Sequence, residues 1–252
     1  MMNKLNTLAV AGAAALALSA PVSAEYLYGF GSVSANYLDW TDKTEERAGK
    51  GDFLFLEAEG GAGFTWGDVY GFIDLENPFA GSGHDDANKD TRTAIKGNVG
   101  INTPVDNVQL FAQVYNLADS SGYNVVNQKY GLRYTLFTES GFWAKPFIAT
   151  HYAHNSYDGG GFAGLTGGTI GWVAGYDFQA AGQKFSVSNW HETDFARDEA
   201  YNEDSVGHDG AIALWWHATD NLTAGLQYRY SHNNLGSATY QDGMIYTVKY
   251  NF

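Results

Sequence analysis

The stretch Asp52–Pro78, DFLFLEAEGGAGFTWGDVYGFIDLENP, decides the fold. On both sides of a turn at Thr65–Asp68, apolar residues recur at every second position, which is the period of a β-strand. One face carries small and aliphatic side chains. The opposite face carries aromatic rings and four carboxylates: Glu57, Glu59, Asp74 and Glu76. The stretch therefore predicts a β-hairpin whose two faces suit a boundary between lipid and an aqueous lumen.

The spacing of the two strands also predicts a register. A four-residue turn sets Glu57 opposite Glu76 and Glu59 opposite Asp74. Like charges directly opposite each other destabilise a sheet. We therefore expect cations or water on this face.

The first 24 residues are predicted to be a signal peptide. Lys4 precedes the apolar run Leu8–Leu18, and Val22–Ala24 has the small residues of a cleavage site. Residues 25–252 are then one domain. Acids number 28 against 14 bases, for a net charge of −14, which becomes −15 (28 against 13) once Lys4 is removed. So acidic a chain is a poor candidate for binding nucleic acid.

Alternation along the remaining chain predicts twelve strands. These are residues 27–40, 52–64, 69–77, 91–102, 108–117, 128–137, 142–154, 168–178, 184–194, 208–217, 222–232 and 242–252. Short turns alternate with longer polar loops, and no helix is expected between them. This is the pattern of a twelve-stranded antiparallel transmembrane β-barrel of the outer membrane, with both termini in the periplasm. The alternative is an exported β-sandwich or jelly roll, which would not be expected to alternate so regularly.

The final strand supports the barrel. Alternating apolar residues end in Phe252, which resembles the signal that barrel-assembly machinery reads. Tryptophans near strand ends are expected in the interfacial girdles: Trp40, Trp66, Trp143, Trp190 and Trp216. Pro146 cannot donate to a ladder, so we expect a bulge or a frayed strand there.

Residue parity predicts which side chains line the lumen. The predicted pore-lining, substrate-binding set is Phe53, Phe55, Glu57, Glu59, Tyr70, Phe72, Asp74, Glu76, Arg92, Lys96, Lys129, Arg133, Arg229 and Lys249. The same parity adds Phe111, Tyr115, Lys145, Phe147 and Asp177. We expect acids of the second and third strands to face bases of the fourth, sixth and closing strands. Such a pore favours solutes with a flat ring and many polar groups, although paired charges can also plug a narrow barrel.

Enzymatic chemistry has little support in the sequence. His151 and His154 lie three residues apart, which puts them on opposite faces of a strand. His191 and His208 lie beside acids, but no motif supplies a nucleophile. The chain has no cysteine, and no loop shows the ligand spacing of a calcium site. We predict no catalytic residues, no metal and no cofactor.

The hairpin also resembles a known family. Leu56–Gly61, followed by Asp68–Leu75, resembles the Tsx/OmpK family of nucleoside-specific outer-membrane channels. The matching positions are Glu57, Glu59, Tyr70, Phe72 and Asp74. The resemblance implies a twelve-stranded barrel with a narrow pore for nucleosides, whereas some OmpK-type members resemble phage receptors.

The expected function is passive diffusion of small solutes, nucleosides first, through the outer membrane. Two alternatives stay open: a non-conducting structural or receptor barrel, and an outer-membrane hydrolase. The expected partners are outer-membrane lipid and lipopolysaccharide, the solute, the barrel-assembly machinery, and a phage or colicin at the extracellular loops.

Overall fold

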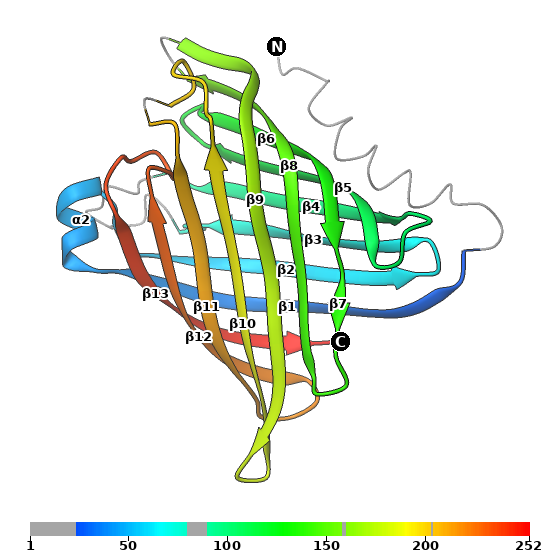
Figure 1. The fold of residues 1–252 in the computed structure, drawn as a ribbon. Helices are drawn as coiled ribbons and strands as arrows, with labels where there is room; N and C mark the ends of the chain where they lie inside the picture. Colours follow the sequence, from blue (N-terminus) through cyan, green and yellow to red (C-terminus); the bar gives the residue numbers. More distant parts are fainter. Residues whose placement is uncertain (1–23, 80–89, 158–159, 203) are drawn as a thin grey trace.

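The computed structural model describes residues 24–79, 90–157, 160–202 and 204–252 (Figure 1). The predicted signal peptide therefore lies outside the described residues, except for Ala24. The strands are β1 Tyr26–Trp40, β2 Phe53–Phe64, β3 Gly67–Glu76, β4 Arg92–Asn102, β5 Val108–Asp119, β6 Asn124–Tyr134, β7 Leu136–Phe137, β8 Phe142–Tyr157, β9 Gly160–Ala180, β10 Gln183–Phe195, β11 Gly207–His217, β12 Leu222–His232 and β13 Gln241–Asn251.

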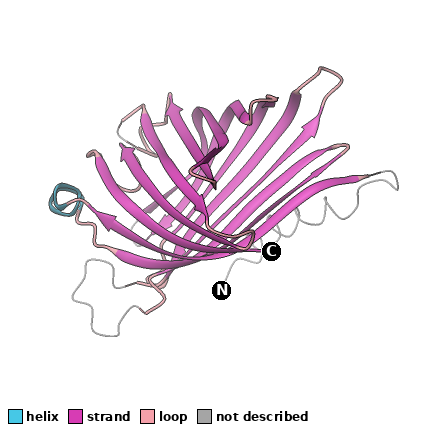
Figure 2. Ribbon diagram, turned by 90° about the horizontal axis from the view of Figure 1, so that it is seen from below, coloured by secondary structure: helices cyan, strands magenta, loops and turns pink. Residues whose placement is uncertain are grey.

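These strands form a closed antiparallel barrel, as predicted. Consecutive strands pair throughout, except β6 with β7, and β1 pairs with β13. β6 also pairs directly with β8, and the two-residue β7 continues the path of β6, so the ring has twelve strands. Figure 2, seen from below, shows the strands curving around a common interior.

The turn between β2 and β3 is tighter than the predicted one. Phe64 pairs with Gly67, which leaves two residues in the turn. Gly67 allows this turn because its φ of 151° is a conformation that other residues rarely adopt. A side chain would also be excluded there, since a Cβ would lie 1.9 Å from the carbonyl oxygen of Gly100. Glu57 consequently lies opposite Asp74, and Glu59 lies opposite Phe72. The predicted register was wrong by two residues, a shift that leaves every side chain on its predicted face.

The two faces of the sheet differ in chemistry. Leu56, Ile73 and Leu110 are exposed on one face. On the other face, side chains from strands that are not neighbours meet in ion pairs, such as Lys96 of β4 with Glu192 of β10. Contacts of this kind can form only across the interior of the ring. The apolar face therefore points outward, and the charged face points into the lumen.

One predicted loop contains a short helix, α2, over Asp42–Ala48. Thr41 caps its start by accepting a hydrogen bond from the Thr44 amide, and Gly49 ends it in the left-handed conformation. The prediction of a helix-free chain was therefore wrong, because it overlooked these capping residues. Within the described ranges, no helix is long and apolar enough to cross a membrane.

Pro146 does not break β8. It pairs with Trp172 of β9 in a continuous register, and the irregularity lies instead between Thr150 and Tyr152. One missing donor removes a single ladder hydrogen bond, and the neighbouring pairs keep the register. The residue at the irregularity is His151, which is 1% exposed. β8 and β9 also extend into the predicted loop 155–167.

Three of the predicted girdle tryptophans have the inward parity. Trp40 is buried, and Trp190 lies beneath the cationic groups of Lys96 and Arg229. Trp143 shares the parity of the inward-facing Lys145, whereas Trp216 is exposed on the outer face. Parity, rather than nearness to a strand end, decides which side a tryptophan takes.

Candidate channel lumen

The predicted pore-lining residues share the inward face of the barrel. The register puts them in phase with each other from strand to strand: Glu57 with Asp74, Phe72 with Lys96, and Lys129 with His151. Their role in binding a solute stays a prediction. The added residues Phe111, Tyr115, Lys145, Phe147 and Asp177 have the same inward parity.

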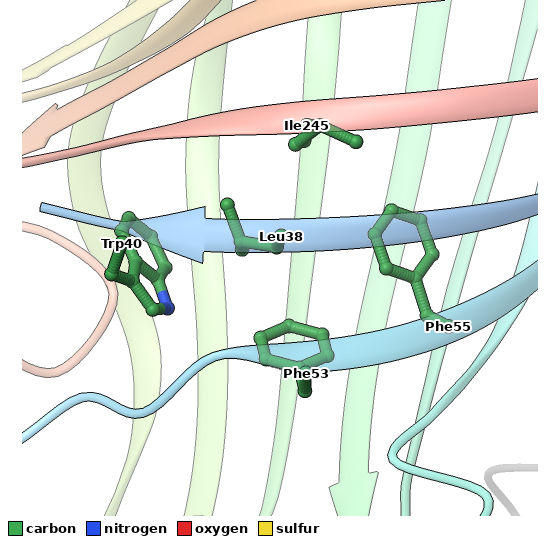
Figure 3. Close-up of a cluster of buried hydrophobic side chains, with 5 residues drawn as sticks. All are labelled: Leu38, Trp40, Phe53, Phe55 and Ile245. Carbon is green, nitrogen blue, oxygen red and sulfur yellow. The ribbon is translucent and has the colours of Figure 1, made fainter.

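An apolar cluster covers part of the inner wall at the end of β1 next to α2. Figure 3 shows its side chains over β1, β2 and β13: Leu38, Trp40, Phe53, Phe55 and Ile245. Leu235, from the loop between β12 and β13, packs against the cluster. Phe53 and Phe55 are only 8% and 9% exposed, which leaves little ring surface for a solute. Tyr70 and Phe72 remain half-buried, so they are the more accessible rings of the predicted set.

Most acids of β2 and β3 are paired. Glu59 forms an ion pair with Lys249 of β13 and accepts a hydrogen bond from the Tyr70 hydroxyl at 2.9 Å. Glu76 accepts from Arg92 at 2.7 Å. These pairs match the prediction that acids here face bases of the fourth and closing strands. They also neutralise the like charges that the sequence places together.

Glu192 of β10 forms a bridge across the lumen. Its carboxylate binds Lys96 of β4 at 2.9 Å and Lys129 of β6, and the Gln113 amide of β5 donates to it at 3.0 Å. One carboxylate thus connects β10 to three strands that lie elsewhere on the ring. The expected partners of Lys96 and Lys129 were acids of β2 and β3, so this part of the prediction was wrong.

Glu192 was not among the predicted lumen residues, although the alternation of its strand indicates its face. Trp190, Glu192 and Asp194 alternate with His191 and Thr193 within the predicted strand 184–194. The segment was interpreted as a possible general base with its orienting acid, so the inward parity of Glu192 was overlooked.

Asp194 extends the bridge toward the long loop after β10. It accepts hydrogen bonds from Thr169 at 2.5 Å and from Lys129 at 3.4 Å. Nearby, the Tyr201 hydroxyl donates to Asn127 of β6 at 3.2 Å, and its ring contacts His151. The loop that follows β10 therefore reaches inward and packs on β6 and β8. Burial, followed by the charge of Asp194, raises the pKa of Tyr201 to about 12.

Arg197 anchors the same loop. It is buried and donates to the backbone carbonyls of Asp204 at 2.9 Å and Asn233 at 2.7 Å. Burial lowers the pKa of its guanidinium, and the carboxylate of Asp194 opposes that shift. Both Arg197 and Tyr201 fix the loop by hydrogen bonds that few other side chains could replace.

A third cluster lies near the short turns at the opposite end of the lumen. Arg133 of β6 binds Asp68 of β3 at 2.6 Å, and Lys145 binds the same carboxylate at 3.2 Å. Gln109 accepts from the Arg133 guanidinium at 2.7 Å. Two cations thus share one acid, so this cluster carries one more positive than negative charge. Beside them, the rings of Phe111 and Phe147 lie 4.7 Å apart.

The predicted bases of the closing strands also contact acids and aromatic rings. Arg229 of β12 binds both oxygens of Asp209 at 3.0 Å and lies over the Trp190 ring. Lys249 lies over the Trp215 ring at 4.7 Å. Rings and cations therefore alternate around this wall, an arrangement that stabilises the cations by cation–π attraction.

The histidines do not assemble a catalytic site in the described residues. His151 faces inward and His154 faces outward, as predicted. His191 and His208 lie on the outward parity, and both contact the Thr193 hydroxyl. The second ring nitrogen of His191 is taken by Tyr230 at 2.9 Å, so no carboxylate orients it. Within the described ranges no group of acids and histidines could hold a metal.

A closed twelve-stranded barrel with an apolar outer face and a lumen of paired charges is the architecture of an outer-membrane channel. A solved porin structure, NanC, superposes with a TM-score of 0.52 at 11% identity, covering 86% of this chain and 98% of that one. The family model for the nucleoside-specific channel-forming protein Tsx matches residues 35–252. The chain belongs to this family and is a passive channel of the outer membrane.

Other barrels are less similar. A bacterial polysaccharide outer membrane secretin has a TM-score of 0.42 at 8% identity, covering 88% of this chain and 97% of that one. The translocator domain of the autotransporter NalP from Neisseria meningitidis has a TM-score of 0.41 at 12% identity, covering 98% and 95%.

Proposed function

We propose that nucleosides cross the outer membrane through this lumen by binding weakly to successive groups on its wall. The observation that carries the proposal is the Glu192 bridge to Lys96 and Lys129, because it places polar groups across the lumen that a solute has to pass. A path of this kind excludes large solutes and rewards those that can replace lost hydration with hydrogen bonds. Membership in the Tsx family supports the choice of nucleosides.

The predicted lumen residues contact different parts of the solute according to their chemistry. Tyr70 and Phe72 stack on the base, because they are the more accessible rings of the set. Phe53 and Phe55 pack in the apolar cluster with Leu38, Trp40 and Ile245 and stabilise that part of the wall. The charged members exchange hydrogen bonds with ribose hydroxyls and base edges: Glu57, Glu59, Asp74, Glu76, Arg92, Lys96, Lys129, Arg133, Arg229 and Lys249. Binding must stay weak enough for the solute to leave.

The test is conductance of the refolded protein in a planar bilayer. Adenosine or uridine at millimolar concentration should lower the conductance, whereas ribose at the same concentration should not, because ribose has no base to stack. Phe72→Leu should weaken the block, and the matched variant Phe137→Leu, at a residue 62% exposed near the barrel end, should leave it unchanged. A conductance that neither nucleoside changes would contradict nucleosides as the substrate.

The alternative is a receptor barrel with a closed lumen. The Glu192 bridge would support this receptor alternative if it closed the lumen completely. A correctly folded protein that never conducts would support this alternative. A phage or colicin would then be sought at the loops that join β10 to β11 and β12 to β13.

The remaining expectations concern export and assembly. We propose that residues 1–24 are removed, that both termini lie in the periplasm, and that the strand ending in Phe252 engages the barrel-assembly machinery. Lipid and lipopolysaccharide surround the outer face. We propose no catalytic activity and no cofactor. Within the described residues, the Ser186 hydroxyl contacts His217 at 2.8 Å, but the other ring nitrogen of His217 contacts Thr223 and not an acid.

A further inference from the structure

Glu57 and Asp74 differ from the other carboxylates in the middle of the lumen. Each of the others holds a lysine or arginine: Glu59 with Lys249, Glu76 with Arg92, Glu192 with Lys96 and Lys129, and Asp209 with Arg229. Within the described residues, neither Glu57 nor Asp74 forms an ion pair. The chain thus supplies a cation to every neighbouring acid and leaves this pair without one.

The two carboxyl groups lie together. Glu57 and Asp74 are direct partners in the β2–β3 ladder, and both point inward. Direct cross-strand partners have Cβ atoms about 4.5–5.5 Å apart, so two carboxylates at these positions repel each other unless a positive charge neutralises them. Asp74 is only 8% exposed, and its Oδ1 is buried without a hydrogen-bond partner. Glu57 is half-buried beside it and accepts one long hydrogen bond, 3.4 Å, from the Ser34 hydroxyl.

The surrounding charges do not neutralise the pair. Glu59 and Glu76 flank it on the same two strands and are themselves acidic. Two cations of the closing strands, Lys249 of β13 and Arg229 of β12, face the same lumen. Each of these is already bound to another carboxylate. A buried acceptor oxygen without a donor is destabilising, so a donor supplied from the lumen would be stabilised here.

We propose that Glu57 and Asp74 form a binding subsite for the primary ammonium group of a solute. An ammonium group has three donors, and the two oxygens of the Glu57 carboxylate and Asp74 Oδ1 are three acceptors for them. The Ser34 hydroxyl supports Glu57 as a donor and is itself held by the Asn36 amide at 2.9 Å. The ammonium supplies the positive charge that the two carboxylates otherwise lack. Phe72 and Tyr70, the next inward residues along β3, offer rings against which the rest of such a solute packs.

A divalent metal fits the site less well than an ammonium group. Calcium takes six to eight oxygen ligands, and the described lumen brings no third acid or histidine into a metal-binding group with this pair. The subsite lies in the same lumen as the proposed nucleoside path, but it does not require that nucleosides bind. It adds a class of ligand, the primary amines, to the function proposed above.

Calorimetric titration of the refolded protein in detergent at low ionic strength tests the subsite. The probes are n-butylammonium chloride and n-butanol, which have similar shape and differ in charge. We expect butylammonium to bind with at least about tenfold higher affinity than butanol, a ratio that corresponds to about 1.4 kcal/mol. Equal binding of the two probes by the wild-type protein would overturn the proposal.

Two neutral variants sharpen the test. Asp74→Asn and Glu57→Gln should each lower butylammonium affinity about tenfold or more. Asp106→Asn, at an exposed position in the turn between β4 and β5, should not change it. Undiminished affinity in both luminal variants would contradict the proposal, and if a variant does not fold, the wild-type comparison of the two probes still decides. Nucleoside titration of the same samples tests the proposed function separately.

Discussion

Glu192 shows how much one inward side chain can determine in a barrel. Its carboxylate takes donors from β4, β5 and β6 while its own backbone belongs to β10. Lys129, one of its partners, is almost fully buried. A buried lysine needs a paired acid to stay charged, so Glu192 contributes both to the stability of the barrel and to the width of the lumen.

Glu192→Gln is predicted to change ion selectivity. The substitution leaves Lys96 without its carboxylate and Lys129 with only Asp194, so the lumen gains positive charge and its preference moves toward anions. Removing one partner of a buried pair also costs about 3–5 kcal/mol of folding free energy. Reversal potentials across a potassium chloride gradient measure the first effect, and urea unfolding in lipid vesicles measures the second.

The control for this change lies outside the lumen. Glu139→Gln removes one carboxylate from an exposed position in the turn between β7 and β8, so it alters net charge equally without touching the bridge. A reversal potential that moves by the same amount in both variants would assign the effect to overall charge and would contradict a role for the Glu192 bridge.

At the scale of elements, close approach between strands constrains several positions. In β6, a Cβ at Gly131 would lie 1.9 Å from the Ile148 carbonyl oxygen of β8. In β4, a Cβ at Gly97 would meet nothing nearer than a methyl group of Val114 at 3.8 Å. Both residues are strand glycines, but only Gly131 lies where two backbones come together, at the β6–β8 ladder.

Gly131→Ala is therefore predicted to weaken the β6–β8 ladder. The backbones must separate to admit the methyl group, which costs about 1–3 kcal/mol as overpacking. Gly97→Ala should be neutral or slightly stabilising, because the methyl group fits and the unfolded chain loses freedom. Urea unfolding of the two variants in vesicles measures the difference in stability. Equal unfolding midpoints would contradict the close approach of the β6 and β8 backbones at Gly131.

At the scale of the whole molecule, closure of the ring joins the two ends of the described chain. β1 pairs with β13 over nine residue pairs, from Ser32 with Asn251 to Trp40 with Gly243. Ala35 lies opposite Val248 on the outward face of this ladder. Lys249 and Glu59 add an ion pair that spans β1. Closure leaves no sheet edge exposed to lipid, where unpaired backbone groups would be costly.

Closure predicts a cross-link between the first and last strands. The chain has no cysteine, so Ala35→Cys with Val248→Cys places one thiol pair at this ladder. Direct cross-strand partners have Cβ atoms about 4.5–5.5 Å apart, so a short bifunctional thiol reagent should join them in the folded protein. Ala35→Cys with Leu132→Cys, on β1 and β6, should not react. Electrophoretic mobility detects the cross-link. A cross-link in the β1–β6 pair and none in the β1–β13 pair would contradict the strand order.

The sequence by itself determined the class of fold and the face that each strand residue takes. Period-two alternation depends only on neighbours along the chain, so it assigned Glu57, Asp74, Lys129 and Arg133 to one face without any knowledge of the ring. The regular spacing of turns gave the number of strands in the barrel for the same reason. Even an error of two residues in the β2–β3 register left these faces unchanged, because two is the period of the strand.

Only the tertiary structure decided which luminal side chains meet. The partner of Lys129 lies on β10, 63 residues away along the chain, and the curvature of the ring, rather than local alternation, brings it there. The same holds for Tyr201, whose loop folds back onto β6, and for Phe53 and Phe55, which pack into a cluster with β13. Local patterns fix which face a side chain takes, whereas contacts across the lumen depend on the closed ring.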